Sequence, residues 1–293
     1  MDQASKLREM VQANQEQTNA RVIAVTSGKG GVGKTTLSVN LALEMAKKGM
    51  RVVIFDADFG LANVEVMLGI RPQYNLLDLI HNQKSMAEII TKGPEGIGFI
   101  SGGSGVSELA TLDTVSIKRL ISELVKLDQM YDVVIIDTGA GITDSVMEFV
   151  MMSPEVILVV TPEPTSITDS YSLLKVLRRK ENFNPLYKTI HVVANRVENE
   201  TEGKEIFHKI NTVSSKFLNT KLQFLGSIHA DKNVSMAVIE QKPLIHAYPN
   251  TLAAKGVYQL AGSLMEETEQ EYKKKDGIAR VFIDFFRSKK RIK

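Results

Sequence analysis

The chain has 293 residues, of which 43% are hydrophobic, and its formal net charge is +2 at pH 7. This length and apolar content are enough for one large α/β core, so we expect a single main domain. The absence of cysteine excludes disulfides, iron–sulfur clusters, a cysteine nucleophile and zinc thiolate sites. The small net charge gives no global reason to expect nucleic-acid binding.

No segment predicts a signal peptide or a membrane span. The first residues are polar, and no later run reaches the roughly 18 apolar residues that a transmembrane helix needs. We therefore expect a cytoplasmic protein, or one held reversibly on a membrane surface.

Residues 1–20 are rich in glutamine, asparagine and charge, and only a sparse apolar stripe has helical spacing. Such a segment buries little surface, so its residues alone predict a loosely docked extension. We place the main domain at residues 21–265, and a linker with a terminal helix at residues 266–293.

The stretch TSGKGGVGKTT at residues 26–36 lies between an apolar run typical of a strand and a segment with helical spacing. Backbone N–H groups of such a glycine loop, together with the helix N-terminus, bind phosphate oxygens. We expect Lys34 to contact the β- and γ-phosphates and the Thr35 hydroxyl to bind Mg²⁺. The predicted nucleotide-binding residues of this loop are Gly28, Lys29, Gly30, Gly31, Val32, Gly33, Lys34, Thr35 and Thr36.

Two buried strand patterns end in carboxylates. Residues 51–55 lead to Asp56 and Asp58, and residues 133–136 lead to Asp137. The carboxyl ends of parallel strands line the ligand crevice of an open sheet, so Asp137 is predicted to support Mg²⁺. The glycines at 139 and 141 predict a turn that responds to the γ-phosphate.

The strand pattern at residues 190–194 ends in Asn195 and Arg196. An amide at this place can both donate to and accept from an adenine edge.

A second amphipathic pattern occupies the C-terminal region. The apolar positions from 278 to 286 fall on one helical face and a basic cluster follows. A helix docked on the core has the same pattern. The basic cluster favours an anionic membrane, at about 1 kcal/mol per basic residue. Two tails in one dimer would gain about 10²- to 10⁴-fold in effective concentration. The predicted membrane residues are Ile278, Val281, Phe282, Phe285, Phe286, Arg287, Lys289 and Lys290.

The run KGGVGKTT resembles the deviant Walker A motif of the MinD/ParA family of P-loop ATPases. The resemblance implies a three-layer P-loop NTPase fold, with a mostly parallel twisted sheet and helices on both faces. It also implies an ATP-dependent homodimer in which Lys29 reaches the partner's nucleotide. The implied catalytic residues are Lys29, Lys34 and Asp58, of which Asp58 orients the attacking water. The resemblance also implies that Asp56 supports the Mg²⁺ shell.

Residues 224–231 resemble the last strand of this family and its G-x-I-P-x-D loop. The resemblance implies that Ile228 and Asp231 line the adenine. His229 stands where proline is usual, which leaves the base contacts open.

The stretch DQASKLR matches the DQAxxLR signature of FlhG (also FleN or YlxH), the flagellar regulators of this family. There the segment binds and activates the GTPase FlhF. The resemblance implies slow ATP hydrolysis as a switch, control of flagellar number or placement, contact with flagellar C-ring proteins, and reversible binding to the inner face of the membrane. The matching residues are Asp2, Gln3, Ala4, Leu7 and Arg8.

Two other functions fit the same fold. One is a MinD-type cell-division regulator, which has a similar tail but ordinarily begins almost at the first strand. The other is a metabolic ATP-dependent enzyme, for which neither Lys29 nor an amphipathic tail has a use.

Overall fold

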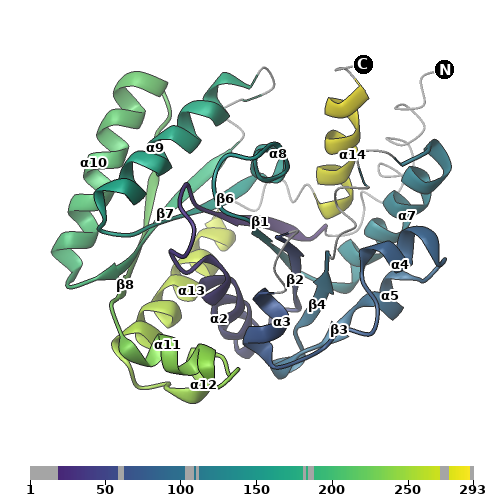
Figure 1. Ribbon diagram of the computed structural model, residues 1–293, viewed down its shortest axis with the longest axis horizontal. Helices are drawn as coiled ribbons and strands as arrows, with labels where there is room; N and C mark the ends of the chain where they lie inside the picture. Colours follow the sequence, from purple (N-terminus) through teal and green to yellow (C-terminus); the bar gives the residue numbers. More distant parts are fainter. Residues whose placement is uncertain are drawn as a thin grey trace.

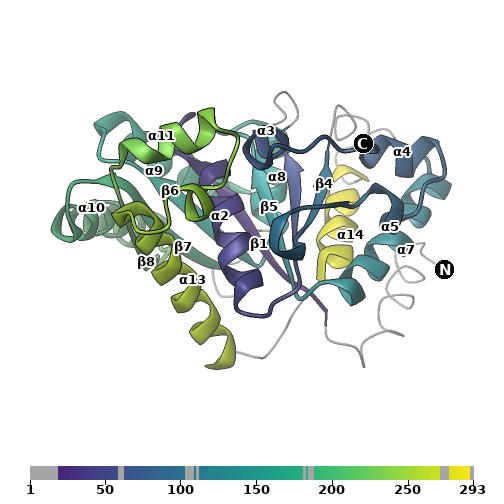
Figure 2. The same ribbon diagram turned by 90° about the horizontal axis from the view of Figure 1, so that it is seen from below.

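The computed structural model describes residues 19–58, 63–102, 109, 112–180, 183, 188–270 and 277–290. These residues form three layers, with a central sheet between two layers of helices (Figures 1 and 2). The predicted fold class is confirmed.

Eight strands of the described part of the chain form one sheet, in the order β3-β4-β2-β5-β1-β6-β7-β8. Neighbouring strands are parallel except β3 and β4. The inner strands are continuous runs of β-branched and other apolar residues because both of their faces are buried. The strands are β1 (Arg21–Thr26), β2 (Val52–Ala57), β3 (Thr91–Lys92), β4 (Gly98–Ser101), β5 (Val133–Thr138), β6 (Glu155–Val160), β7 (Thr189–Val197) and β8 (Gln223–His229).

One face of the sheet is covered by the helix that follows the glycine loop and by helices from the C-terminal third. Their apolar side chains pack on alternate strand residues such as Ile23, Ile54 and Ile135. The helices on this side are α2 (Lys34–Lys47), α3 (Asn63–Leu68), α11 (Lys232–Ile239), α12 (Leu244–Ala247) and α13 (Leu252–Gln270).

The opposite face carries the remaining helices over two adjoining apolar clusters. They are α4 (Leu76–His81), α5 (Met86–Ile89), α7 (Thr114–Met130), α8 (Asp144–Met152), α9 (Pro164–Arg179), α10 (Glu200–Leu218) and α14 (Gly277–Lys290). A short 3₁₀ turn, η1 (Pro94–Gly96), precedes β4.

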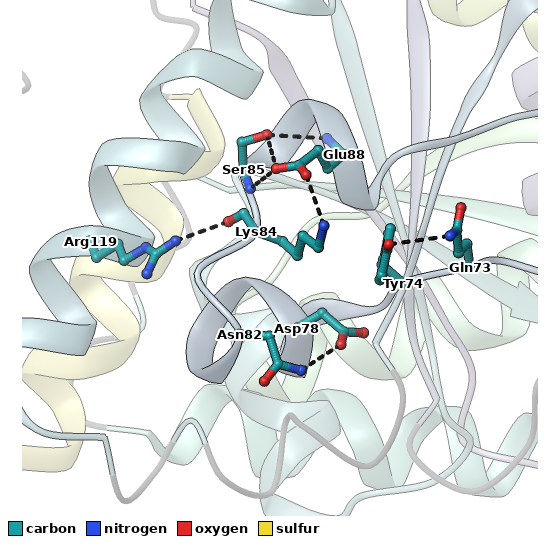
Figure 3. Close-up of polar contacts among 8 residues, drawn as sticks. All are labelled: Gln73, Tyr74, Asp78, Asn82, Lys84, Ser85, Glu88 and Arg119. Atoms are coloured by element: carbon teal, nitrogen blue, oxygen red, sulfur yellow. Dashed lines mark hydrogen bonds and ion pairs between the residues drawn. The ribbon is translucent and has the colours of Figure 1, made fainter.

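Polar contacts hold α4, α5 and α7 together near the sheet edge (Figure 3). Asn75 and Ser85 cap α4 and α5 through reciprocal capping boxes. Lys84 Nζ lies 3.0 Å from Glu88 Oε1, and Arg119 of α7 donates to the Lys84 carbonyl at 3.2 Å. These contacts position α7, which in turn binds the terminal helix.

Helix α14 docks on the core rather than presenting its apolar face to the surroundings. Ile278, Val281, Phe282 and Phe286 are all at least 93% buried, within the cluster that also contains β2, β5 and α7. The contact of this face with lipid stays a prediction, and in this conformation the face is covered. The physical reason is that a groove between α7 and α8 satisfies the same apolar stripe that a bilayer would. The side chains of Phe285, Arg287, Lys289 and Lys290 lie outside the described residues.

The first turn of α14 is capped by a residue from another helix. Asp128 of α7 accepts hydrogen bonds from the backbone N–H groups of Ile278 at 2.7 Å and Ala279 at 3.2 Å. Gly277 has φ +72°, and a Cβ there would lie 2.6 Å from the Asp128 carboxylate, so glycine is required for this approach. Among the helices in the described ranges, none is long and apolar enough to cross a membrane.

Candidate functional site

The glycine loop runs from the end of β1 to the first residue of α2, as predicted. Gly33 precedes α2 with φ +96°, a left-handed conformation that favours glycine. At Gly28 the backbone of α9 comes so close that a Cβ would lie 2.2 Å from the Asp169 carbonyl carbon. The loop is therefore held between α2 and α9, with the N-terminus of α2 facing the place where phosphate is expected.

Lys34 and Asp137 form the buried centre of the site. Lys34 is 8% exposed and Asp137 is fully buried. Burial lowers the pKa of Lys34, and the nearby charges of Asp137 and Asp58 oppose that shift. Burial also raises the pKa of Asp137 to about 6, although hydrogen bonds from Thr35 and Ser38 favour its ionised form. The site therefore buries a lysine and an aspartate, and the charge of each shifts the pKa of the other.

Asp56 lies beside Asp137 because β2 and β5 pair in register at these two residues. Burial, followed by the charge of Asp137, raises the pKa of Asp56 to about 8. At least one of these two neighbouring carboxyls is therefore protonated near neutral pH. A bound Mg²⁺ would change their protonation state, because its charge favours the ionised forms.

Asp58 follows the end of β2 and is half-buried. Its backbone N–H donates to Asp56 Oδ1 at 3.0 Å, and Asn63 at the start of α3 donates to Asp58 Oδ2 at 3.1 Å. A Cβ placed on Gly139 would lie 3.3 Å from Asp58 Oδ1. Asp58 therefore reaches the turn after β5, and its water-orienting role stays a prediction.

The donor set fits a Mg²⁺-bound nucleotide. Asp137 Oδ1 accepts from Ser38 Oγ at 2.8 Å, while its buried Oδ2 accepts no hydrogen bond from the described residues. No group of three or more His, Asp or Glu side chains in the described ranges could hold a metal. Mg²⁺ commonly binds one or two protein oxygens and completes its shell with phosphates and water.

Lys29 lies apart from this buried centre. Its Nζ donates to the Thr165 hydroxyl, at the start of α9, across 2.8 Å on the protein surface. Lys34, in the same loop, is turned inward. The two lysines therefore have different surroundings, and Lys29 stays at an exposed face next to the loop.

The predicted base-binding residues gather at one edge of the site. Asn195 and Ile228 are paired across β7 and β8. Asn195 Nδ2 donates to the Val32 carbonyl and Arg196 Nη2 donates to the Gly31 carbonyl, each at 2.7 Å. These two side chains thus fasten the glycine loop, and their predicted contact with adenine stays a prediction.

Ile228 is 5% exposed, and Asp231 caps α11 by accepting from the backbone N–H of Asn233 at 2.9 Å. Both lie beside the predicted base site, but the Asp231 carboxylate is already used as a helix cap. The partner-binding residues Asp2, Gln3, Ala4, Leu7 and Arg8 lie outside the described residues.

Three side chains of the site were missed from sequence. Ser38 follows Lys34 by one helical turn, so the spacing of α2 could have indicated it. Asn63 and Thr165 carry no local signal, because their contacts with Asp58 and Lys29 depend on how separate elements pack.

Comparisons with known proteins agree with this arrangement. The ParA family model, described as NUBPL iron-transfer P-loop NTPase, matches residues 18–265. The antiactivator FleN of Pseudomonas aeruginosa is 42% identical over 246 residues, covering 83% of this chain and 86% of FleN. The flagellum site-determining protein YlxH of Helicobacter pylori is 34% identical over 253 residues, covering 86% of this chain and 84% of YlxH.

A solved structure shows the same fold. The septum site-determining protein MinD of Pyrococcus horikoshii, complexed with Mg-ADP, has a TM-score of 0.66 and 22% identity, covering 87% of this chain and 99% of that one. The family-model match over residues 18–265 includes the glycine loop and both acidic strand ends. The chain therefore belongs to the MinD/ParA family of P-loop ATPases and is a homologue of FleN and YlxH.

Proposed function

We propose that the protein is an ATP-driven dimerisation switch that regulates flagellar number or placement. The observation that carries this proposal is the contrast between the two loop lysines. Lys34 is buried at the phosphate site, whereas Lys29 lies at the surface on Thr165. A cation beside a phosphate loop, but outside its own site, is suited to the nucleotide of a second copy.

Each residue of the site has one task in this proposal. The loop N–H groups and Lys34 bind the phosphates, while Thr35 and Asp137, with Asp56 beside them, would hold Mg²⁺. The metal, when bound, supplies positive charge against the phosphate oxygens. Asp58, held by Asn63, orients the attacking water. The Lys29 of each subunit completes the site of the other, so loss of the γ-phosphate weakens the dimer.

Membrane binding in this proposal requires α14 to leave its groove. The apolar face of α14 is covered by α7 and α8 in the monomer, so it is unavailable to lipid in that state. The ATP-bound dimer would release both tails, and two linked tails bind an anionic surface more strongly than one. The switch therefore controls both the presence and the number of membrane anchors.

The flagellar part of the proposal rests on the likeness to FleN and YlxH and on residues 2–8. We propose that this segment binds and stimulates the GTPase FlhF, and that flagellar C-ring proteins are further partners. ATP and ADP with Mg²⁺ are the proposed ligands, as in the Mg-ADP complex of MinD.

Co-sedimentation with vesicles tests the membrane switch. Full-length protein is mixed with phosphatidylglycerol-containing vesicles and either ATP or ADP, and a variant that ends at residue 276 serves as the control. We expect the full-length protein to sediment only with ATP, and the shortened variant with neither nucleotide. Neutral phosphatidylcholine vesicles should capture much less. Equal sedimentation with ATP and ADP would show that the nucleotide does not control the tail.

A further inference from the structure

The turn after β5 touches the nucleotide site and leads straight into α8. Gly141 N donates to the Ser27 carbonyl at 3.0 Å, and Thr138 Oγ1 donates to the Val25 carbonyl at 2.9 Å. On its other side the turn approaches Asp58 at Gly139. A change at the phosphates is therefore expected to move residues 139–143, and with them the first residue of α8.

The middle of α8 meets the terminal helix through aromatic rings. The Phe149 and Phe282 ring centroids are 5.9 Å apart with their planes at 66°, an edge contact. Phe55, the residue before Asp56, lies 5.8 Å from Phe282 and 5.9 Å from Phe149. All three side chains are at least 98% buried. We call these three residues the aromatic trio.

The aromatic trio joins three elements that have different relations to the nucleotide. Phe55 is on β2 directly before a predicted Mg²⁺ carboxylate, Phe149 is on the helix that follows the turn, and Phe282 is on the tail. A closely packed contact of this kind transmits a shift because the interior has little free volume to absorb it. The tail is therefore connected to the phosphate site by two packed paths, one through Phe55 on β2 and one through Phe149 on α8.

We propose that Phe149 and Phe282 are positioning residues through which the docked tail holds the turn at residues 139–143 in an arrangement with weaker preference for ATP over ADP. The sign of this effect rests on the proposed function, in which ATP goes with tail release. Coupling between two sites is reciprocal, so if ATP loosens the tail, removing the tail must favour ATP by the same factor. A purely structural role for these rings would lower stability and leave the nucleotide preference unchanged.

The test measures dissociation constants for ADP and for a non-hydrolysable ATP analogue, without lipid and at protein concentrations too low for dimers. The ratio of the two constants is compared between the full-length chain, Phe282→Ala and a variant that ends at residue 276. We expect the preference for the ATP analogue to rise at least about fivefold in both variants, the lower end of typical coupling. Phe149→Leu, which keeps an apolar side chain against a docked tail, should give a smaller rise in the same direction.

A second aromatic pair, away from the tail, supplies the control. Phe207 of α10 and Phe224 of β8 are half-buried, have ring centroids 5.2 Å apart, and pack against the cluster on the far side of α8 from the tail. Phe207→Ala should lower stability without changing the nucleotide ratio. A ratio within about twofold of the full-length value in the shortened variant and in Phe149→Leu would overturn the proposal. Because no vesicle enters this experiment, that result would leave the vesicle test and the proposed function standing.

Discussion

Lys29 and Lys34 belong to one loop, yet only Lys34 is buried beside the carboxylates. The loop conformation separates them, because Gly33 directly precedes α2 and Lys34 points inward from its first turn, while Lys29 lies on the surface against Thr165. Both lysines and their spacing could be read from the sequence. The hydrogen bond from Lys29 to Thr165 could not be predicted, because it depends on where α9 packs.

Replacement of Lys29 by alanine should abolish the ATP-dependent dimer and leave nucleotide binding by the monomer nearly unchanged. Each dimer would lose two charge-assisted hydrogen bonds of about 1.5–3 kcal/mol each, one per Lys29, so dimer affinity should fall at least about 100-fold. Light scattering behind a size-exclusion column measures the mass with ATP. Lys34→Ala is the contrasting variant and should lose nucleotide binding itself. A dimer that survives Lys29→Ala would remove the role of this lysine in the partner's site.

Ser38→Ala should destabilise the protein by about 1–3 kcal/mol, because it leaves Asp137 Oδ1 buried without its 2.8 Å hydrogen bond. Urea unfolding without nucleotide measures this loss, and binding of Mg-ATP should also weaken. Ser170→Ala is the control: it is equally buried, but its hydroxyl has no hydrogen-bond partner among the described residues. Equal losses in the two variants would mean that Ser38 acts through packing alone.

At the scale of elements, the strands could be predicted more fully than the terminal helix. A parallel strand buried on both faces has few alternatives, so the runs that end at Asp56 and Asp137 indicated both the sheet and the acidic edge. The stripe of α14 is different, because a groove and a bilayer satisfy the same apolar face. What distinguishes them is the groove itself, which α7 and α8 form from residues far away in the sequence.

The cap on α14 gives a prediction about pH. Burial raises the pKa of Asp128 from 3.8 to about 6, although the backbone donors at Ile278 and Ala279 oppose this. The folded state therefore favours the protonated carboxyl. Its contribution to stability is fully present below about pH 3.8 and is lost as pH rises through about 6. The difference between the two pKa values corresponds to about 3 kcal/mol.

Urea unfolding of the full chain and of Asp128→Asn, at several values between pH 4 and 7, measures this effect. The free energy of unfolding of the natural chain, minus that of the variant, should fall by about 2–3 kcal/mol across this interval. The subtraction removes the titration of Asp56 and Asp137, which both proteins share. A difference that stays constant with pH would mean that Asp128 does not titrate in this window.

At the scale of the whole molecule, the family could be recognised from the sequence because the loop and the acidic strand ends are local patterns. The order of the strands and the covered tail could not, since both depend on contacts between distant segments. The likeness to FleN favours the flagellar reading over a cell-division or metabolic one.

A peptide of residues 1–20 should raise the rate of GTP hydrolysis by FlhF in a multiple-turnover assay. The same peptide with Asp2, Gln3 and Arg8 replaced by alanine is the control, because it removes polar side chains of the signature and keeps the length. The full-length protein should stimulate at least as well as the peptide. If neither the peptide nor the full-length protein changes GTP turnover, FlhF is not the partner of this segment.

Asp128 also accepts a hydrogen bond from the backbone N–H of Ala20, the residue before β1. One carboxylate thus ties down both the entry of the chain into the ATPase domain and the root of the tail. A protein bound to the residues upstream of Ala20 and a lipid surface bound to the tail would each act on a segment that contacts Asp128. A force on either segment would therefore act on α7 through the same carboxylate.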